Sequence, residues 1–388
     1  MRKILFIIPF FLWTCGGGES SPTSPEDSDG TDSGGTDPVS TGSWSLMFED
    51  SEESVGSSVK ETSDGKYVFT GSAGSSTSKK VLYGKVSSFG GSPILEWTKT
   101  ADKSTGGGGS IEITNDGGYI ITGVLESQIY ILKVGNSGNL EWDTSYDTGT
   151  SYSRGAEIRQ TSDGGYIIAG YDGKAFLLKI NSTGGQEWIK TYDTSSDNSF
   201  FWSVFQTSDG GYIAGGEKGG TNRDAYIVKT DTSGNEEWSL TYGGVDRDAF
   251  KAVRQTSDGG YILSGHHTQS NTWLIKTDNQ GTVTWENFYG ASGMVGGYLD
   301  ITSDGGYILV GLTESFGDDH IQIVKTDASG NQEWEQFHGA NIANGVKAFF
   351  AESIKATSDG GYVIVGETQG NKSNMFMMKI DSSGNRIF

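Results

Sequence analysis

The chain has little cysteine, little proline and little positive charge. One Cys among 388 residues excludes a disulfide framework and a cysteine-rich zinc site. Only 28 Lys and Arg residues stand against 49 Asp and Glu residues, so at a net charge of −21 there is no basic surface to neutralise nucleic-acid phosphates. Five Pro and 60 Gly mean that glycine makes the turns. So much glycine argues against long helices, because each interior Gly costs about 1 kcal/mol relative to Ala.

A short apolar run opens the chain. Arg2 and Lys3 precede the apolar residues 4–13, which is the pattern of a secretory signal. The run is shorter than the roughly 20 residues that a membrane-spanning helix needs. The sole cysteine, Cys15, follows directly.

The stretch Leu12-Trp13-Thr14-Cys15-Gly16 resembles a bacterial lipoprotein signal. The resemblance implies cleavage before Cys15, a diacylglycerol on its sulfur and attachment to a membrane through this lipid. Because Gly16 stands where an inner-membrane retention Asp would stand, the expected location is the outer membrane or the cell surface.

The next segment has the composition of a flexible tether. It contains six acidic residues, no basic ones and almost no apolar ones, so it cannot bury a core. We therefore divide the chain into a lipoprotein signal peptide (1–14), an acidic Gly/Ser-rich linker (15–42) and a folded part (43–388).

Seven copies of a repeat fill the folded part at a mean spacing of about 49 residues. An aliphatic residue lies five positions before a repeated Asp, a Tyr three positions after it and a Gly seven positions after it. A Lys and then an aromatic residue follow further on. The repeated aspartates are Asp64, Asp116, Asp163, Asp209, Asp258, Asp304 and Asp359.

Each repeat divides into four short strands separated by turns. In the fifth copy we expect strand A at 253–256, strand B at 261–265, strand C at 273–277 and strand D at 283–288. The Asp-Gly pair between strands A and B supplies the positive φ of a tight hairpin. Four strands in a period of 40–50 residues are typical of a propeller blade. The sequence therefore predicts an all-β fold, a seven-bladed β-propeller with four-stranded blades.

The two ends of the repeat array complement each other. Residues 44–48 match strand D of the fourth copy, and the seventh copy stops at Phe388, where its own strand D should begin. The N-terminal strand 44–48 is therefore predicted to complete the last blade and close the ring, which leaves no open sheet edge.

The repeat resembles that of secreted bacterial and archaeal β-propeller proteins with the pattern TSDGGYI…G…KTDxxGNxEW, seen here at 207–213 and 229–238. The resemblance implies the architecture and an extracytoplasmic location, and no activity. There is also a likeness to the tryptophan-docking motif of quinoprotein propellers, but the spacing from Asp231 to Trp238 is one residue shorter, and no cofactor is expected.

Residues that recur in every blade are expected to be structural. The Tyr of strand B and the aromatic residue of strand D should pack between blades. The Gly after strand B should permit a close approach or a bulge. Each repeated Lys should place its stem along the blade and its ammonium on a turn carboxylate such as Asp231.

Function is expected on the face that holds the B–C and D–A loops, because most length variation lies there and variable loops on a rigid scaffold commonly bind. Aromatic residues beside carboxylates and Arg suit sugar or peptide recognition. The alternative for Trp202 and Phe350 is a place in strand A or between blades. The candidate ligand-binding residues are Tyr152, Arg154, Phe200, Phe201, Arg223, Asp246, Arg247, Asp248, His266, His267, Asp318, Asp319 and His320.

Catalysis and metal binding find little support in the sequence. No nucleophile elbow or zinc-protease motif is present. His266 and His267 with Asp318 or Asp319 are the alternative for a metal site on the loop face. We expect a monomeric, lipid-anchored binding or interaction module for a protein partner or a polysaccharide, with no metal and no nucleic-acid ligand. The alternatives are a polysaccharide hydrolase or lyase using Asp248 and Asp319, and a structural scaffold of the cell envelope.

Overall fold

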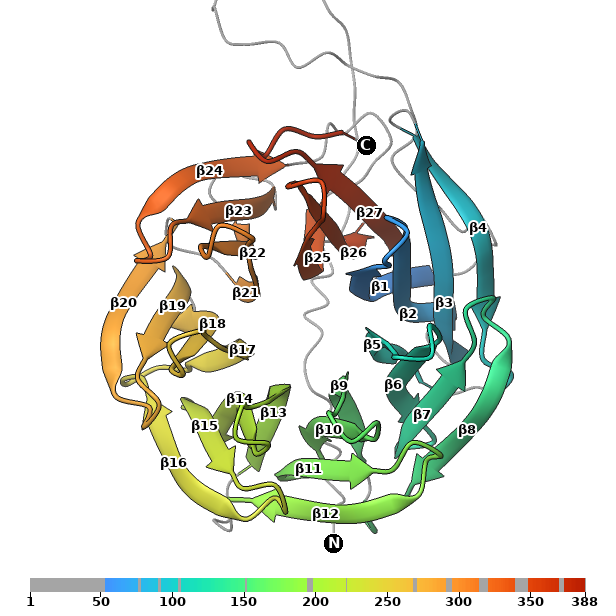
Figure 1. Cartoon of the computed structure of the whole chain (residues 1–388), viewed down its shortest axis with the longest axis horizontal. Coiled ribbons are helices and arrows are strands. Elements are labelled where there is room, and N and C mark those ends of the chain that lie inside the picture. Colours follow the sequence, from blue (N-terminus) through green and yellow to red (C-terminus); the bar gives the residue numbers. More distant parts are fainter. Residues whose placement is uncertain are drawn as a thin grey trace, which may run out of the picture. The chain divides into compact units, whose positions relative to one another are not determined.

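The protein is built of antiparallel β-sheets, and the described residues contain no helix. The computed structural model describes residues 53–75, 78–89, 92–103, 106–150, 152–193, 198–220, 222–267, 271–290, 295–313, 320–338, 348–369 and 373–387. Seven sheets surround a central axis (Figure 1). The predicted seven-bladed β-propeller is therefore confirmed.

The strands follow one another from the axis outward within each blade. Blade 1 holds β1 (Glu53–Glu61), β2 (Tyr67–Ser75), β3 (Ser78–Phe89) and β4 (Ser92–Thr100). Blade 2 holds β5 (Gly108–Ile113), β6 (Tyr119–Leu125), β7 (Gln128–Val134) and β8 (Leu140–Tyr146). Blade 3 holds β9 (Arg154–Gln160), β10 (Tyr166–Tyr171), β11 (Ala175–Ile180) and β12 (Gln186–Tyr192). Blade 4 holds β13 (Asn198–Gln206), β14 (Tyr212–Gly219), β15 (Asp224–Thr230) and β16 (Glu236–Tyr242).

The remaining blades repeat this order. Blade 5 holds β17 (Ala249–Gln255), β18 (Tyr261–His267), β19 (Asn271–Thr277) and β20 (Val283–Tyr289). Blade 6 holds β21 (Val295–Ile301), β22 (Tyr307–Thr313), β23 (His320–Thr326) and β24 (Gln332–His338). Blade 7 holds β25 (Ala348–Ala356), β26 (Tyr362–Gln369) and β27 (Asn374–Ile380). The strand predicted at 44–48 to complete blade 7 lies outside the described residues.

Hydrophobic clusters join every blade to the next. One of them packs Val59 and Phe69 of blade 1 against Val365 and Met375 of blade 7, so the ring also closes in its core. The Trp of each outer strand contacts the Tyr of the next blade, as predicted, for example Trp188 with Tyr212 at 5.8 Å between ring centroids.

Two repeated glycines permit this packing. Gly234, at φ +74° in a C–D turn, lies where a Cβ would come within 2.7 Å of the Trp188 ring of the preceding blade. Gly216, which lies within strand B (β14), is placed where a Cβ would come within 1.8 Å of the Phe200 carbonyl oxygen. The predicted close approach of the strand-B glycine is therefore confirmed.

The repeated Lys meets a turn carboxylate, as predicted, but the example given, Asp231, is wrong. Lys229 Nζ lies 2.9 Å from Asp209 in the A–B turn and 2.9 Å from Glu237 on the outer strand. Burial raises the pKa of Asp209, but the Thr207 hydroxyl and Lys229 outweigh it and lower the pKa to about 2. Asp231 instead accepts the Ser233 and Asn235 backbone N–H groups of its own turn.

Each innermost strand contains one β-bulge, which positions the site described below. In β13 the register against β14 shifts between Phe201 and Ser203, so Trp202 is the extra residue. A bulge turns a side chain away from the face that strict alternation would give it. The corresponding bulge residues of the seven blades are Ser57, Gly109, Ala156, Trp202, Lys251, Gly297 and Glu352.

Candidate functional site

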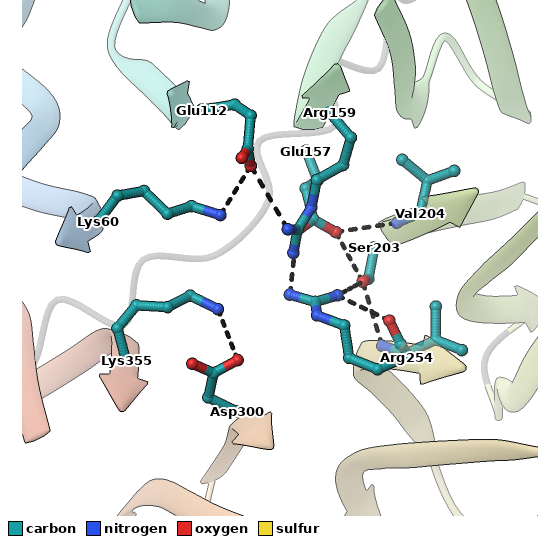
Figure 2. Close-up of polar contacts among 10 residues, drawn as sticks. Lys60, Glu112, Glu157, Arg159, Ser203, Val204, Arg254, Asp300 and Lys355 are labelled. Carbon is teal, nitrogen blue, oxygen red and sulfur yellow. Dashed lines mark hydrogen bonds and ion pairs between the residues drawn. The ribbon is translucent and has the colours of Figure 1, made fainter. Parts of the chain in front are cut away.

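Charged side chains converge on the axis near the A–B turns. They occupy one repeat position, directly after the repeated aliphatic residue of strand A. Figure 2 shows them extending from the innermost strands toward one another. We call this set, with Glu157 and Ser203, the turn-side network. The repeat position is occupied in blades 1 to 7 by Lys60, Glu112, Arg159, Phe205, Arg254, Asp300 and Lys355.

Glu157 is the hub of the turn-side network. Its Oε1 accepts two hydrogen bonds from the Arg159 guanidinium, at 2.7 and 2.9 Å, and one from Arg254 at 3.2 Å. Its Oε2 accepts from the Ser203 hydroxyl at 2.7 Å and the Val204 backbone N–H at 2.9 Å. Burial raises its pKa, but the two guanidinium charges outweigh burial and hold the pKa well below its ordinary value. Glu157 thereby joins blades 3, 4 and 5.

The other members of the network pair in the same way. Lys60 donates to Glu112 at 2.7 Å, which joins blades 1 and 2, and Lys355 donates to Asp300 at 2.9 Å, which joins blades 6 and 7 (Figure 2). Burial is the largest influence on Lys355 and lowers its pKa to about 7, against the opposing charge of Asp300. The cations and carboxylates of the network therefore satisfy one another, and the network holds the blades together.

Aromatic and cationic side chains of blades 3 to 5 gather nearer the B–C and D–A loops. Trp202 stacks on Phe200 with ring centroids 5.8 Å apart and planes at 4°. Tyr171 meets Phe200 edge-on at 4.5 Å, and Tyr152 lies 5.8 Å from Tyr171. Lys251 Nζ lies 4.0 Å from the centroid of the Trp202 ring. Tyr152 is 41% exposed, so the aromatic group reaches the surface.

A buried carboxylate organises the arginines at this place. Arg247 donates to both oxygens of Glu217, at 2.7 and 2.8 Å, and Arg223 donates to the same carboxylate at 3.2 Å. The Arg223 guanidinium also lies 4.6 Å from the centroid of the Phe200 ring, a cation–π distance. We call the whole set the loop-side cluster; its members are Tyr152, Arg154, Tyr171, Phe200, Trp202, Glu217, Arg223, Arg247, Lys251 and His266.

Three nitrogens of the loop-side cluster are buried without a hydrogen-bond partner among the described residues: Trp202 Nε1, Arg223 Nε and His266 Nδ1. His266 is 5% exposed, and burial, with the charges of Lys251 and Arg247, lowers its pKa to about 3, so its imidazole is neutral. A buried donor without a partner costs about 1–3 kcal/mol, so such groups in a native protein indicate a bound water or ligand.

The structure brings together six of the predicted site residues: Tyr152, Arg154, Phe200, Arg223, Arg247 and His266. Two predicted contacts are wrong. Phe201 is fully buried against Tyr226 in the core between blades 3 and 4, because it points to the face opposite Phe200. Asp248 is fully buried, and its carboxylate accepts the Gly244 backbone N–H at 2.9 Å.

The other predicted residues do not join the cluster. Asp246 is exposed on the loop between blades 4 and 5. His267 contacts Trp273 and Phe288 at the end of β18, and His320 begins β23. Asp318 and Asp319 lie outside the described residues. Trp202 and Phe350 lie on innermost strands, as the alternative placement predicted.

Sequence reasoning missed the bulge residues and the charged axis position. Lys251 and Glu352 escaped notice because simple alternation along strand A does not mark a bulge. Aligning the seven repeats column by column would have placed both positions, since the bulge residue lies two positions before the repeated aliphatic residue of strand A and the axis position lies one after it.

In the described parts of the chain, no three His, Cys, Asp or Glu side chains lie close enough together to hold a metal ion. Nor does any helix there have the length and apolar character needed to cross a bilayer.

The fold and site define a seven-bladed β-propeller with a polar axis and an aromatic, cationic cluster on one side of it. No protein-family model matches the chain, and no curated protein matches it. A protein of unknown function from Bacteroides caccae is 14% identical in sequence, with 68% of this chain and 89% of that chain covered and a TM-score of 0.47. Sqt1 from Chaetomium thermophilum is 11% identical, with 87% and 83% covered and a TM-score of 0.54. The likeness to Sqt1 shows the fold alone.

Proposed function

We propose that the protein is a lipid-anchored binding module of the cell envelope, which takes a polysaccharide or a protein partner on the loop face of blades 3 to 5. The loop-side cluster carries this proposal. It combines an exposed aromatic ring, cations held over aromatic faces and buried nitrogens without partners. Groups of this kind bind ligands by stacking and by charge-assisted hydrogen bonds.

The place of the cluster supports binding rather than a purely structural role. In the turn-side network each carboxylate accepts hydrogen bonds from neighbouring strands, and those bonds join the blades. In the loop-side cluster, by contrast, Tyr152 stays exposed and Arg223 keeps a nitrogen unused. In a purely structural cluster we would expect the polar groups to be hydrogen-bonded and the aromatic rings to be buried.

The first experiment measures retention of the purified full-length protein on immobilised polysaccharides and envelope fractions, and scores released sugars in the same samples. We expect retention without release, and loss of retention in Tyr152→Ala. Phe337→Ala is the matched control, because Phe337 is 38% exposed on the outer strand β24, away from the loop-side cluster. Sugar release would favour a hydrolase or lyase, for which the buried Asp248 is no longer a candidate. Defined protein partners without glycan retention would favour a scaffold.

The anchor is tested separately in cells. A radiolabelled fatty acid is expected to be incorporated into the wild-type protein and not into Cys15→Ser, and the variant should leave the membrane fraction. Incorporation into Cys15→Ser, or membrane retention equal to the wild type without any label, would contradict lipidation at Cys15.

A further inference from the structure

The bulge position differs strongly around the ring. Four blades carry Ser57, Gly109, Ala156 and Gly297 there, which have little or no side chain. Blades 4, 5 and 7 carry Trp202, Lys251 and Glu352. In blade 6 the residue after the bulge, Tyr298, donates its hydroxyl proton to Glu352 at 2.8 Å. Large polar and aromatic groups are thus confined to one side of the axis, next to the loop-side cluster.

Two cations in this region have no ion-pair partner in the part of the chain that the structure describes. Among the described residues, neither Lys251 nor Arg154 has a carboxylate oxygen within 4.0 Å. Burial lowers the pKa of Lys251, against the charges of Glu217 and Glu352 and together with those of Arg247 and Arg154. Both Glu217 oxygens are already taken by arginines.

Such unpaired cations are unexpected in this chain. With 49 acidic residues against 28 basic ones, carboxylates are plentiful, and the repeated lysines all find them. Holding a partly buried ammonium without a direct ion-pair partner is unfavourable. An anion supplied by a ligand would remove that penalty.

The geometry points to an acidic sugar unit of a polysaccharide as the ligand of the loop-side cluster, with its carboxylate between Lys251 and Arg154. This inference rests on the proposed function and names the ligand class. The Tyr298–Glu352 pair then meets sugar hydroxyl groups, and the exposed ring of Tyr152 meets the apolar C–H face of a neighbouring sugar unit. Trp202 acts as a positioning residue, because Phe200 stacks on its ring and Lys251 Nζ lies 4.0 Å from the ring centroid.

The net charge of −21 does not oppose this assignment. At physiological ionic strength charges are screened beyond about 8 Å, so carboxylates on the outer strands contribute little at the axis. An anionic ligand in the cluster therefore interacts mainly with the nearby cations. Because a sugar polymer offers carboxylates, hydroxyl groups and apolar ring faces together, it uses all three kinds of group in the cluster, whereas an acidic peptide uses chiefly the cations.

The test compares ligands that differ only in charge. Affinities of the wild-type full-length protein are measured for polygalacturonate, for the same polymer with its carboxylates methyl-esterified, for alginate and for polyglutamate. We expect at least one acidic polysaccharide to bind ten-fold or more tightly than both the methyl ester and polyglutamate, and this difference to shrink as salt is added.

A variant then tests the cation itself. Lys251→Met is expected to lower the affinity for the acidic polysaccharide about ten-fold and to leave that for the methyl ester unchanged. Lys103→Met is the matched control, because Lys103 also lies over an aromatic ring, 5.8 Å from the centroid of Tyr130, but away from the axis. Unfolding midpoints of both variants show whether they are folded. If Lys251→Met does not fold, the comparison of acid and ester on the wild-type protein decides alone.

The outcomes separate this inference from the function on which it rests. Equal affinity for acid and ester, or tighter binding of polyglutamate, overturns the acidic-sugar assignment and leaves a binding module. Retention of neutral glycans or envelope proteins alone does the same. Retention of nothing in either experiment overturns both.

Discussion

The two ends of the propeller axis use the same kinds of side chain differently. Near the A–B turns, cations and carboxylates of the innermost strands pair with one another, and Glu157 alone accepts five hydrogen bonds. Near the loops, Lys251 and Arg154 have no carboxylate within 4.0 Å among the described residues, and three buried nitrogens there lack partners.

The paired charges near the A–B turns hold the blades together, whereas the groups without partners near the loops are available to a ligand. Both ends lie on the same strands, so strand propensity does not explain it. The bulge marks the boundary, since Arg154 and Phe200 precede it on their strands, whereas the strand-A position of the turn-side network follows it. We therefore expect substitutions at the turn end to change stability and substitutions at the loop end to change binding.

The largest expected effect tests the turn end. Glu157→Gln removes the charge that compensates Arg159 and Arg254, and breaking a buried ion pair by removing one partner costs about 3–5 kcal/mol. Urea denaturation of the variant should therefore show a large loss in the free energy of unfolding. Glu141→Gln is the control, because Glu141 is 47% exposed and pairs with Lys133, so its loss should cost at most about 1 kcal/mol. Equal effects would show that the turn-side network contributes no special stability.

A pH titration tests the same end with a smaller expected effect. Burial lowers the folded-state pKa of Lys355 to about 7, against an ordinary 10.5, while Asp300 opposes burial and Lys60, Arg254 and Arg159 add to it. Between these two values the unfolded chain binds a proton that the folded protein lacks, so the free energy of unfolding rises with pH in this window. We expect a rise of about 3 kcal/mol between pH 7 and about 9.5.

The double variant Lys355→Met, Asp300→Asn isolates this contribution. It removes both charges of the pair, so the rise should become shallower, while the part due to Lys60, whose pKa burial also lowers, should remain. Stability that is flat or falling over this range in the wild-type protein would contradict the burial of a neutral Lys355.

Much of the fold could be predicted because the same pattern of strands and turns occurs seven times in the sequence. The strand predicted at 283–288 is β20 (Val283–Tyr289), and the one predicted at 273–277 is β19 (Asn271–Thr277). Strand B of the same blade runs two residues further than predicted, to His267, so that it includes His266. A pattern present in seven copies can be assigned to strands and turns even where one copy is ambiguous. Repetition therefore helps to predict the shared blade structure, and not the features that occur in one blade only.

The candidate site was only partly predictable, because its contacts depend on geometry that alternation does not give. Ordinary strand alternation places Phe200 and Phe201 on opposite faces of β13. A one-residue bulge in β17 concealed Lys251, because simple alternation does not mark the extra residue. Asp231 is nearer to Lys229 in sequence than Asp209 is. The pairing of β14 with β15 nevertheless sets Lys229 opposite Ile213, four residues beyond Asp209.

The smallest expected effect concerns a hydrogen bond at the turn end that some blade interfaces have and the interface between blades 6 and 7 lacks. At three blade interfaces the last residue of strand A is a Gln whose Oε1 accepts a turn N–H of the preceding blade, as Gln255 accepts that of Ser208 at 2.7 Å. Between blades 6 and 7 this position is Ala356, and a pocket of about 270 Å³ lies there, lined in part by Ser303, Ala356 and Gly360.

Ala356→Gln should restore the missing contact, with Oε1 accepting the Ser303 N–H and Nε2 donating to the Gly360 carbonyl, as Gln255 Nε2 donates to Gly259 at 3.2 Å. A net gain of about 0.5–1.5 kcal/mol is expected in urea denaturation, because a hydrogen bond contributes that much to stability. Gln255→Ala, the reverse change, should lose a similar amount. Neither variant should alter retention on polysaccharides, since both lie at the turn end. A stabilised Ala356→Gln protein with weakened retention would show that the two ends of the axis are coupled.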